Sequence, residues 1–249
     1  MIKTRLSGMA VSNDFLLGEK TNVSFDVYAQ GIHSRSGLYN ENDSNSVDGI
    51  ELVFRPKNMN TDLFYNTISD VGHISTSRGN FNWIYDNVSF IKEKHMGITF
   101  ISINIEVGSI YFLKNELIVL SDKLNESNIK LIVEITKRER FFSKPTLKSI
   151  YELHDEGVIF AIDDVSMNEM LTPVFNLSVF MFIKIKMHAY CSIINKHSFI
   201  DKMIKNNKKL IIEHVESNEQ FMKLALDPIP FFQGYFLCTP KIIGSIINN

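Results

Sequence analysis

Short apolar runs alternate with segments of helical length along most of the chain, and this alternation limits the fold more than any other feature. Runs rich in Ile, Val and Phe predict about eight strands. The predicted strands are Val23–Ile32, Gly49–Arg55, Ile98–Ile105, Lys130–Thr136, Val158–Asp163, Met181–Lys186, Lys209–His214 and Phe231–Leu237. The helical segments between them include Ser109–Glu126, Pro145–Glu156, Tyr190–Asn206 and Ser217–Leu226. Strands that alternate with helices are typical of a mostly parallel sheet.

Eight such strands in 249 residues favour an α/β fold, a (β/α)8 barrel of the TIM type. The polar stretch Ser34–Asp48 predicts an exposed hairpin connection, so we expect the first two strands to be antiparallel to each other. A doubly wound sheet is the alternative, although no Gly-rich turn follows a strand as a dinucleotide site would require. No linker or repeat divides the chain. Residues 21–249 are therefore expected to form one barrel domain, and residues 1–20 a tail or an extra helix.

The sequence predicts neither export nor a membrane span. The first 20 residues lack the apolar run of a signal peptide, and the longest apolar run, Val179–Ile183, is far shorter than the roughly 20 residues that span a bilayer. The expected location is the cytoplasm, with no membrane partner. Cys191 and Cys238 lie outside any C-x-x-C spacing, and we interpret both as small core residues.

The charge balance bears on possible partners. Lys and Arg number 26 and Asp and Glu 28, which gives a formal net charge of −2. Proteins that bind nucleic-acid polymers normally carry a clustered basic excess, so a polymer of this kind is not an expected partner. Hydrophobic residues make up 45% of the chain, enough for a sizeable core.

Polar side chains recur near the ends of the predicted strands, in the row opposite the apolar one. In Ile50–Arg55, for example, Glu51 shares a face with Arg55 while Leu52 lies on the other face. In a barrel the second row points toward the axis, and its strand-end members meet at the mouth where barrel enzymes work. The converging set is Glu51, Asn104, Glu134, Asp163, Asp164 and Glu213.

A single acid on a strand more often faces solvent or caps a helix than binds a ligand. Six polar residues at the ends of different strands are hard to explain in that way, because a packed barrel core has no use for them. Five carboxylates in one cavity need compensating charge. Hard oxygen ligands suit Mg²⁺ or Mn²⁺, and neighbouring carboxylates such as Asp163 and Asp164 suit a pair of ions.

These residues resemble the EAL-domain family of bacterial cyclic di-GMP phosphodiesterases over about Val23–Ile247. The Glu-Ala-Leu-x-Arg signature of the family corresponds to Glu51-Leu52-Val53-Phe54-Arg55. The other matching blocks are Tyr28 to Ile32, Ser102 to Asn104, Val133 to Thr136, Ala161 to Asp164, Ile183 to Ile185, Glu213 to Ser217 and Gln233 to Tyr235. The blocks occur in the family's order, and the family fold is a (β/α)8 barrel.

The resemblance implies hydrolysis of cyclic di-GMP to linear pGpG, with two Mg²⁺ or Mn²⁺ ions as cofactors. It implies that Glu51, Asn104, Glu134, Asp163, Asp164 and Glu213 hold the ions. Lys184 would position or help to activate the attacking water, Glu216 would order the ligands and Glu51 would also take part in catalysis. Arg55, Gln30, Gln233 and Tyr235 are the implied substrate-binding residues, and the fork of Arg55 suits a phosphate.

The sequence departs from the family pattern at four places. Lys137 stands where the family has a second Glu, and the loop Val165 to Asn168 differs from the family's Gly-rich loop. Lys186 replaces an acid two residues after Lys184, and His214 stands where the family has Gly. In the family that loop couples metal binding to dimerisation, so a homodimer is one possibility here. The alternative function is a catalytically silent EAL protein that acts as a cyclic di-GMP receptor or binds a protein partner.

Overall fold

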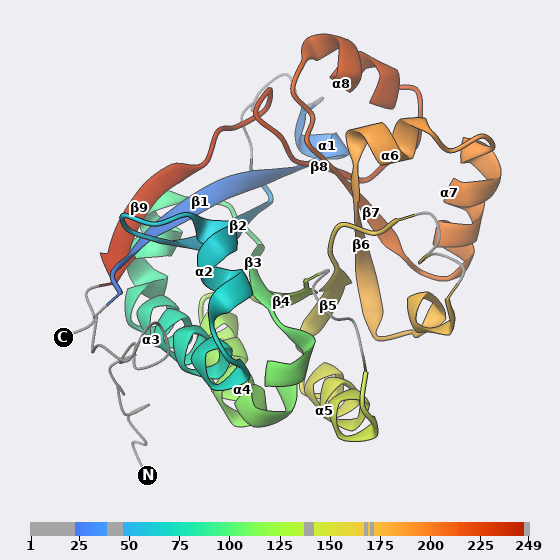
Figure 1. Ribbon diagram of the computed structural model, residues 1–249. Coiled ribbons are helices and arrows are strands. Elements are labelled where there is room, and N and C mark those ends of the chain that lie inside the picture. Colours follow the sequence, from blue (N-terminus) through green and yellow to red (C-terminus); the bar gives the residue numbers. More distant parts are fainter. Residues whose placement is uncertain (1–22, 39–46, 137–141, 167–168, 170–171, 247–249) are drawn as a thin grey trace.

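The computed structural model describes residues 23–38, 47–136, 142–166, 169 and 172–246 (Figure 1). Our predictions for residues 1–20 and Lys137, and part of that for the loop Val165 to Asn168, lie outside these ranges. No helix in the described ranges has both the length and the apolar character needed to cross a membrane.

Eight strands close into a barrel, which confirms the predicted fold class. The barrel strands are β1 (Phe25–Ser34), β2 (Gly49–Pro56), β3 (Phe100–Ile105), β4 (Lys130–Ile135), β5 (Ile159–Ile162), β6 (Phe180–Lys186), β7 (Lys209–Glu213) and β8 (Phe231–Phe232). Strands β2 to β8 follow one another in parallel, and β1 closes the ring by pairing antiparallel with both β8 and β2. The expected antiparallel arrangement of the first two strands is therefore present.

Successive side chains along each strand lie in two different packing environments, as the sequence pattern indicates. One row of side chains packs outward under the helices in the main hydrophobic core. The opposite row points into the barrel, and its lower part forms a separate apolar cluster that we call the plug. The plug consists of Ile32, Phe100, Ile132, Ala161, Phe182 and Ile211, none of which is more than 5% exposed.

Helices form an outer layer around the barrel (Figure 1). They are α1 (Arg35–Leu38), α2 (Thr61–Thr67), α3 (Asp70–Lys94), α4 (Ile110–Asn125), α5 (Lys144–Asp155), α6 (Met187–Cys191), α7 (Lys196–Lys205) and α8 (Asn218–Leu224), with short 3₁₀ turns at Val107–Ser109 and Pro173–Asn176. Side-chain caps define several helix starts: the Ser69 and Ser143 hydroxyls accept hydrogen bonds from Gly72 N and Thr146 N.

The longest helix, α3, is not among the segments singled out from the sequence. It buries Phe81, Ile84, Val88 and Ile91 along one narrow stripe, while most of its other positions are polar. A ninth strand, β9 (Lys241–Ile246), was also not predicted; it pairs antiparallel with β1 outside the closed ring. The two elements contact each other, since a Cβ at Gly244 would lie 2.4 Å from the Trp83 ring.

Two predicted elements are shorter than expected. The strand predicted over Phe231–Leu237 ends at Phe232, because the chain turns at Gly234 and Cys238 N donates to the Gly234 carbonyl. The tight turn depends on glycine: a Cβ at position 234 would lie 2.2 Å from the Val215 carbonyl oxygen. The helix predicted over Tyr190–Asn206 is divided, since α6 ends at Cys191 and α7 begins at Lys196.

The interpretation of both cysteines as core residues is wrong. Cys191 is exposed and Cys238 is half-buried, and both are free thiols. Cys191 is the last residue of α6, and Cys238 follows the turn at Gly234, so neither side chain lies on a face that packs into the core.

Candidate functional site

One buried lysine lies among carboxylates at the carboxyl ends of the parallel strands. Lys184, on β6, is 1% exposed. Its Nζ lies 3.0 Å from Glu51 Oε2, 2.7 Å from Glu134 Oε2, 2.9 Å from Glu213 Oε1 and 4.0 Å from Asp163 Oδ1. We call these four acids the carboxylate cluster. They come from β2, β4, β7 and the end of β5, so the parallel register brings together residues that are far apart in the sequence.

Amide side chains complete the surroundings of Glu51. Asn104 Nδ2 donates to Glu51 Oε1 at 2.7 Å, and Gln233 Nε2 donates to Glu51 Oε2 at 2.7 Å. Gln233 Nε2 also lies 3.4 Å from Gln30 Oε1, and Gln30 Nε2 in turn donates to the Cys238 carbonyl oxygen at 3.2 Å. Both oxygens of Glu51 are therefore held in place by neighbours on three different strands or their ends.

The local environment shifts the acid–base properties of the cluster. Burial raises the pKa of Glu134 to about 8, and the charges of Glu51 and Asp163 add to the effect. Burial likewise raises the pKa of Glu213 to about 8. Burial also acts to raise the pKa of Glu51, but Lys184 and the hydrogen bonds from Gln233 and Asn104 outweigh it and leave that pKa lowered.

Lys184 shows the opposite balance. Burial alone would lower its pKa, but the carboxylates of Glu134, Glu213 and Glu51 hold that pKa well above its usual range. The side chain is therefore an ammonium group throughout the physiological pH range. It acts as a fixed positive charge and hydrogen-bond donor in the centre of the cluster.

A cavity of 420 Å³ opens above the cluster and collects most of the predicted site residues. Those that line it are Gln30, Glu51, Arg55, Asp163, Asp164, Glu213, Glu216, Gln233 and Tyr235. Arg55 lies over the Tyr28 ring, with 4.6 Å from its guanidinium carbon to the ring centroid, and its side chain is thereby kept at the rim. Of the predicted residues, Lys184 and Glu134 are buried beneath the cavity, and Asn104 lines the neighbouring one.

That neighbouring cavity, of 610 Å³, shares Val53, Asp163 and Asp164 with the first. Its far wall comes from α2 and α3 and carries polar side chains that the sequence analysis did not identify, among them Asn66 and His73. The sequence analysis missed these residues because it predicted neither of the two helices that carry them. Because they share these residues, the two cavities adjoin each other across the mouth of the barrel.

Asp164 stands apart from the cluster. Its Oδ2 accepts a hydrogen bond from Lys186 Nζ at 2.9 Å, and both side chains are partly exposed. Asp164 and His214, each the residue after a cluster acid, have φ values of 45° and 56° in the left-handed region. Such backbone conformations cost energy in residues other than glycine, and strained residues of this kind are found at functional sites.

The donor set fits a divalent cation in its chemistry. All the candidate ligands are carboxylate or amide oxygens, which Mg²⁺ and Mn²⁺ prefer. Glu134 is fully buried, and its Oε1 has no hydrogen-bond partner within the described part of the chain, so this oxygen is available to a cation. Lys184 nonetheless neutralises part of the cluster, and no three Asp, Glu, His or Cys side chains in the described ranges are arranged to hold a metal ion.

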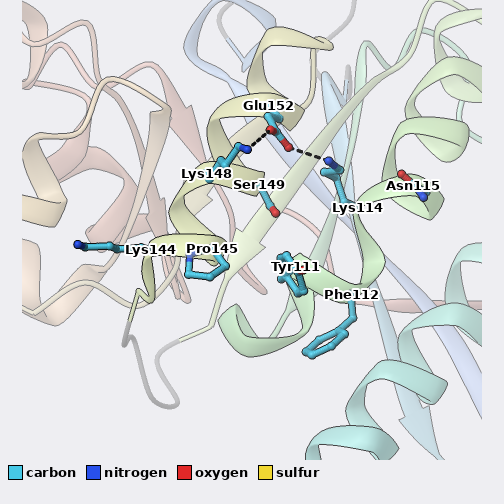
Figure 2. Close-up of a pocket in the computed structure, with 9 residues that line it drawn as sticks. All are labelled: Tyr111, Phe112, Lys114, Asn115, Lys144, Pro145, Lys148, Ser149 and Glu152. Atoms are coloured by element: carbon cyan, nitrogen blue, oxygen red, sulfur yellow. Dashed lines mark hydrogen bonds and ion pairs between the residues drawn. The ribbon is translucent and has the colours of Figure 1, made fainter.

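A larger cavity, of 690 Å³, lies on the outer layer between α4 and α5 (Figure 2). Figure 2 shows Glu152 between Lys148 and Lys114, which it contacts at 3.6 Å and 2.7 Å. These ion pairs are exposed to solvent, where such pairs contribute little. Among the described residues that line this cavity, none of the charged side chains is buried, so the mouth of the barrel is the better candidate for chemistry.

Comparison with known proteins identifies relatives of the same fold. The EAL domain family model matches residues 82–240. The curated protein cyclic di-GMP phosphodiesterase PdeL of Escherichia coli (strain K12) is 27% identical over 155 residues, which are 58% of this chain and 42% of PdeL. This chain thus aligns with less than half of that relative.

Solved structures extend the similarity over most of the chain. The manganese and cyclic di-GMP complex of Klebsiella pneumoniae BlrP1 at pH 9.0 superposes with a TM-score of 0.68 at 20% identity, covering 93% of this chain and 59% of BlrP1. An EAL domain protein from Listeria monocytogenes EGD-e gives a TM-score of 0.61 at 19% identity, covering 98% of this chain and 96% of its own. At these identities the structures establish a shared fold.

Proposed function

This chain belongs to the EAL domain family, and from that premise we propose that it hydrolyses one phosphodiester bond of cyclic di-GMP to give linear pGpG. The relative PdeL is named as a cyclic di-GMP phosphodiesterase, and the BlrP1 complex contains cyclic di-GMP. By lowering this second messenger, such an enzyme in the bacterial cytoplasm would control motility or adhesion.

One observation carries the proposal: four carboxylates surround the ammonium group of Lys184 at the mouth of the barrel. This many buried acids would be costly in a purely structural role. Barrel enzymes place their chemistry at this end of the strands, and a cavity opens there directly above the cluster.

We propose that divalent cations, Mg²⁺ or Mn²⁺, bind at two positions in this site. The first position would be formed by Glu51, Asn104, Glu134 and Asp163, and the second by Asp163, Asp164 and Glu213. Bound there, the ions would lower the pKa of a water molecule and offset the charge that develops on the phosphoryl oxygens. The support for this assignment is the all-oxygen donor set and the Glu134 Oε1 atom, which has no hydrogen-bond partner among the residues that the structure describes.

The side chains of the protein divide the remaining tasks. Because its pKa is held high, Lys184 keeps its proton, so it would orient the cluster and the attacking water by charge and would not act as a base. Arg55, fixed at the rim by Tyr28, would donate to two oxygens of a substrate phosphate. Gln30, Gln233, Glu216 and Tyr235 line the same cavity and would contact the nucleotide or hold its ligands in order.

The test is to incubate the purified protein with cyclic di-GMP and Mg²⁺ or Mn²⁺ and to follow pGpG by chromatography. A Glu51→Ala variant is the control, since it removes a carboxylate that contacts both Lys184 and Gln233. We expect product from the wild type well above that of the variant. If the wild type forms no more pGpG than the variant with either metal, the enzymatic function is contradicted.

A second function is favoured by the pairing of Asp164 with Lys186, which withholds one acid from any cation. Under it, the protein is a catalytically silent receptor for cyclic di-GMP or a regulator that binds another protein, alone or as a homodimer. Calorimetry with cyclic di-GMP in the presence of Ca²⁺ separates these forms. Binding without turnover indicates a receptor, and the absence of binding indicates a regulator that recognises protein alone.

A further inference from the structure

The two lysines of β6 face different numbers of acids. Lys184 lies within 4.0 Å of four carboxylates, whereas Lys186, two residues further along the same inward row, is paired with Asp164 alone. Four carboxylates around one ammonium group leave oxygens to spare, and Glu134 Oε1 is one that has no partner in the described ranges. At Asp164, by contrast, the Lys186 ammonium group contacts the carboxylate directly.

Lys186 and Asp164 form an ion pair at the mouth of the barrel. The two side chains are 31% and 25% exposed, and Nζ lies 2.9 Å from Oδ2. The hydrogen bond to Asp164 raises the pKa of Lys186, with further contributions from the charges of Glu213 and Asp163. Glu213 is also the strand partner of Lys186 in the β6–β7 register. The ammonium group therefore faces the three acids assigned above to the second cation position.

We propose that the Lys186 ammonium group occupies the second cation position, so that a divalent ion enters beside Asp164 only when Lys186 leaves it. The inference rests on the metal assignment of the proposed function. Two positive charges that compete for one carboxylate exclude each other at contact distance. The first position keeps its affinity because the oxygens of its carboxylates outnumber the donors of Lys184. Lys186 is thus a positioning residue that makes the two cation positions unequal.

The inequality is measurable without following catalysis. Metal-free full-length protein is titrated with Mn²⁺, and the unbound ion is measured by electron paramagnetic resonance. We expect one ion to bind the wild type tightly and a second to bind at least tenfold more weakly. In Lys186→Met, which keeps the length of the side chain but removes its charge, we expect the two affinities to lie within about threefold.

The matched control is Lys57→Met. Lys57 forms a lysine–aspartate pair of the same kind with Asp26, at 3.0 Å and with side chains 37% and 28% exposed, and neither residue lines a cavity at the mouth. Its removal should leave both affinities unchanged. Asp164→Asn provides a second check: it should abolish the weak event and leave the tight one within twofold of the wild type.

The outcomes separate this inference from the proposed function. Two equally tight ions in the wild type, or an unchanged gap in Lys186→Met, would overturn the role of Lys186 whether or not cyclic di-GMP is hydrolysed. Unequal binding that Lys186→Met removes would support it even if the wild type formed no pGpG. Loss of the tight event in Asp164→Asn would also count against it, because Asp164 would then belong to the first position.

Discussion

The lower and upper halves of the barrel interior are built by the same strands and have opposite chemistry. Below lies the plug, and above it lie Lys184 and the carboxylate cluster. On four of the strands the change occurs within one step of two residues. The matched positions are Ile132 and Glu134 on β4, Ala161 and Asp163 on and after β5, Phe182 and Lys184 on β6, and Ile211 and Glu213 on β7.

This difference shows how the packing beneath a site can set the pKa values of its side chains. The plug fills the barrel beneath the cluster with aromatic and aliphatic side chains, including contacts between the rings of Phe100, Phe182 and Phe231. It therefore removes solvent from the lower side of the cluster. Glu134 and Lys184 are buried for this reason. Burial raises the pKa of Glu134, while the surrounding carboxylates outweigh burial and hold the pKa of Lys184 above its usual range.

The largest effect, on the free energy of unfolding, is expected when a charge is introduced into the plug. Ile132→Glu would place a carboxylate among the buried apolar side chains of the plug. The cost should exceed about 4 kcal/mol of unfolding free energy, a large part of the total stability of a typical domain. Urea denaturation measures it. Ile132→Val, the control, should cost about 1 kcal/mol. A soluble, stable Ile132→Glu protein would mean that the plug is wetter than its burial indicates.

The next effect comes from removing the cation of the upper half. Lys184→Met would leave Glu51 and Glu134 without their common partner. Loss of one member of a buried ion pair costs about 3 to 5 kcal/mol, and loss of a preorganised charge at a reacting centre lowers kcat by roughly 10² to 10³. Thermal unfolding and pGpG formation are the measurements. Activity close to that of the wild type would show that Lys184 has a purely structural role.

A smaller effect, on pH dependence, separates the two halves because only the upper one titrates. The folded-state pKa of about 8 for Glu134 and Glu213 lies above their ordinary value of 4.5. The metal-free folded state therefore binds more protons than the unfolded state at neutral pH. The stability gained in this way is fully present below pH 4.5 and is lost as the pH rises through 8. The melting temperature of metal-free protein should fall between pH 6 and 9.

The same titration should change metal uptake. A cation needs the deprotonated carboxylates, so the Kd for Mn²⁺ should fall by roughly tenfold per displaced proton between pH 6 and 7. Glu134→Gln, which cannot titrate, should flatten both profiles. Identical profiles for the variant and the wild type would exclude Glu134 as the titrating group.

The smallest effect is expected at the rim, above both halves. Arg55→Lys keeps the charge but removes the planar fork and weakens the contact with Tyr28. We expect KM for cyclic di-GMP to rise by about tenfold, or about 1.4 kcal/mol, with the melting temperature nearly unchanged. A change in kcat without a change in KM would instead place Arg55 at the reacting phosphate.

The alternation of apolar and polar residues made the upper half of the barrel predictable from sequence. Glu51, Glu134 and Glu213 each lie next to outward-facing apolar residues on a strand. The parallel register of the strands then brings the three acids to the same end of the barrel. Distances were not predictable: nothing in the sequence indicates that Lys184 lies at the centre of the four acids, or that Asp164 turns toward Lys186. Side-chain orientations of this kind depend on packing between strands that are distant in sequence.

The elements that were missed have weak local signals. Helix α3 has a polar face wider than its stripe of Phe81, Ile84, Val88 and Ile91, so its periodicity is diluted over a long segment. Strand β9 is half-exposed, with only Ile243 buried, and its pairing with β1 is set by the other end of the chain. The turn at Gly234 depends on a backbone contact with Val215 that exists only in the folded barrel.

Closure of the ring through β1 has a consequence for the order in which the protein folds. Strand β1 must hold its place until β8 and β9, near the other end of the sequence, come to pair with it. Contacts between such distant segments are entropically the most expensive to form and tend to form late. Gln233, which fixes Glu51, follows β8 directly. A chain still emerging from the ribosome would therefore carry its acids in water, and the cluster would acquire its unusual acidity only after the last strands arrive.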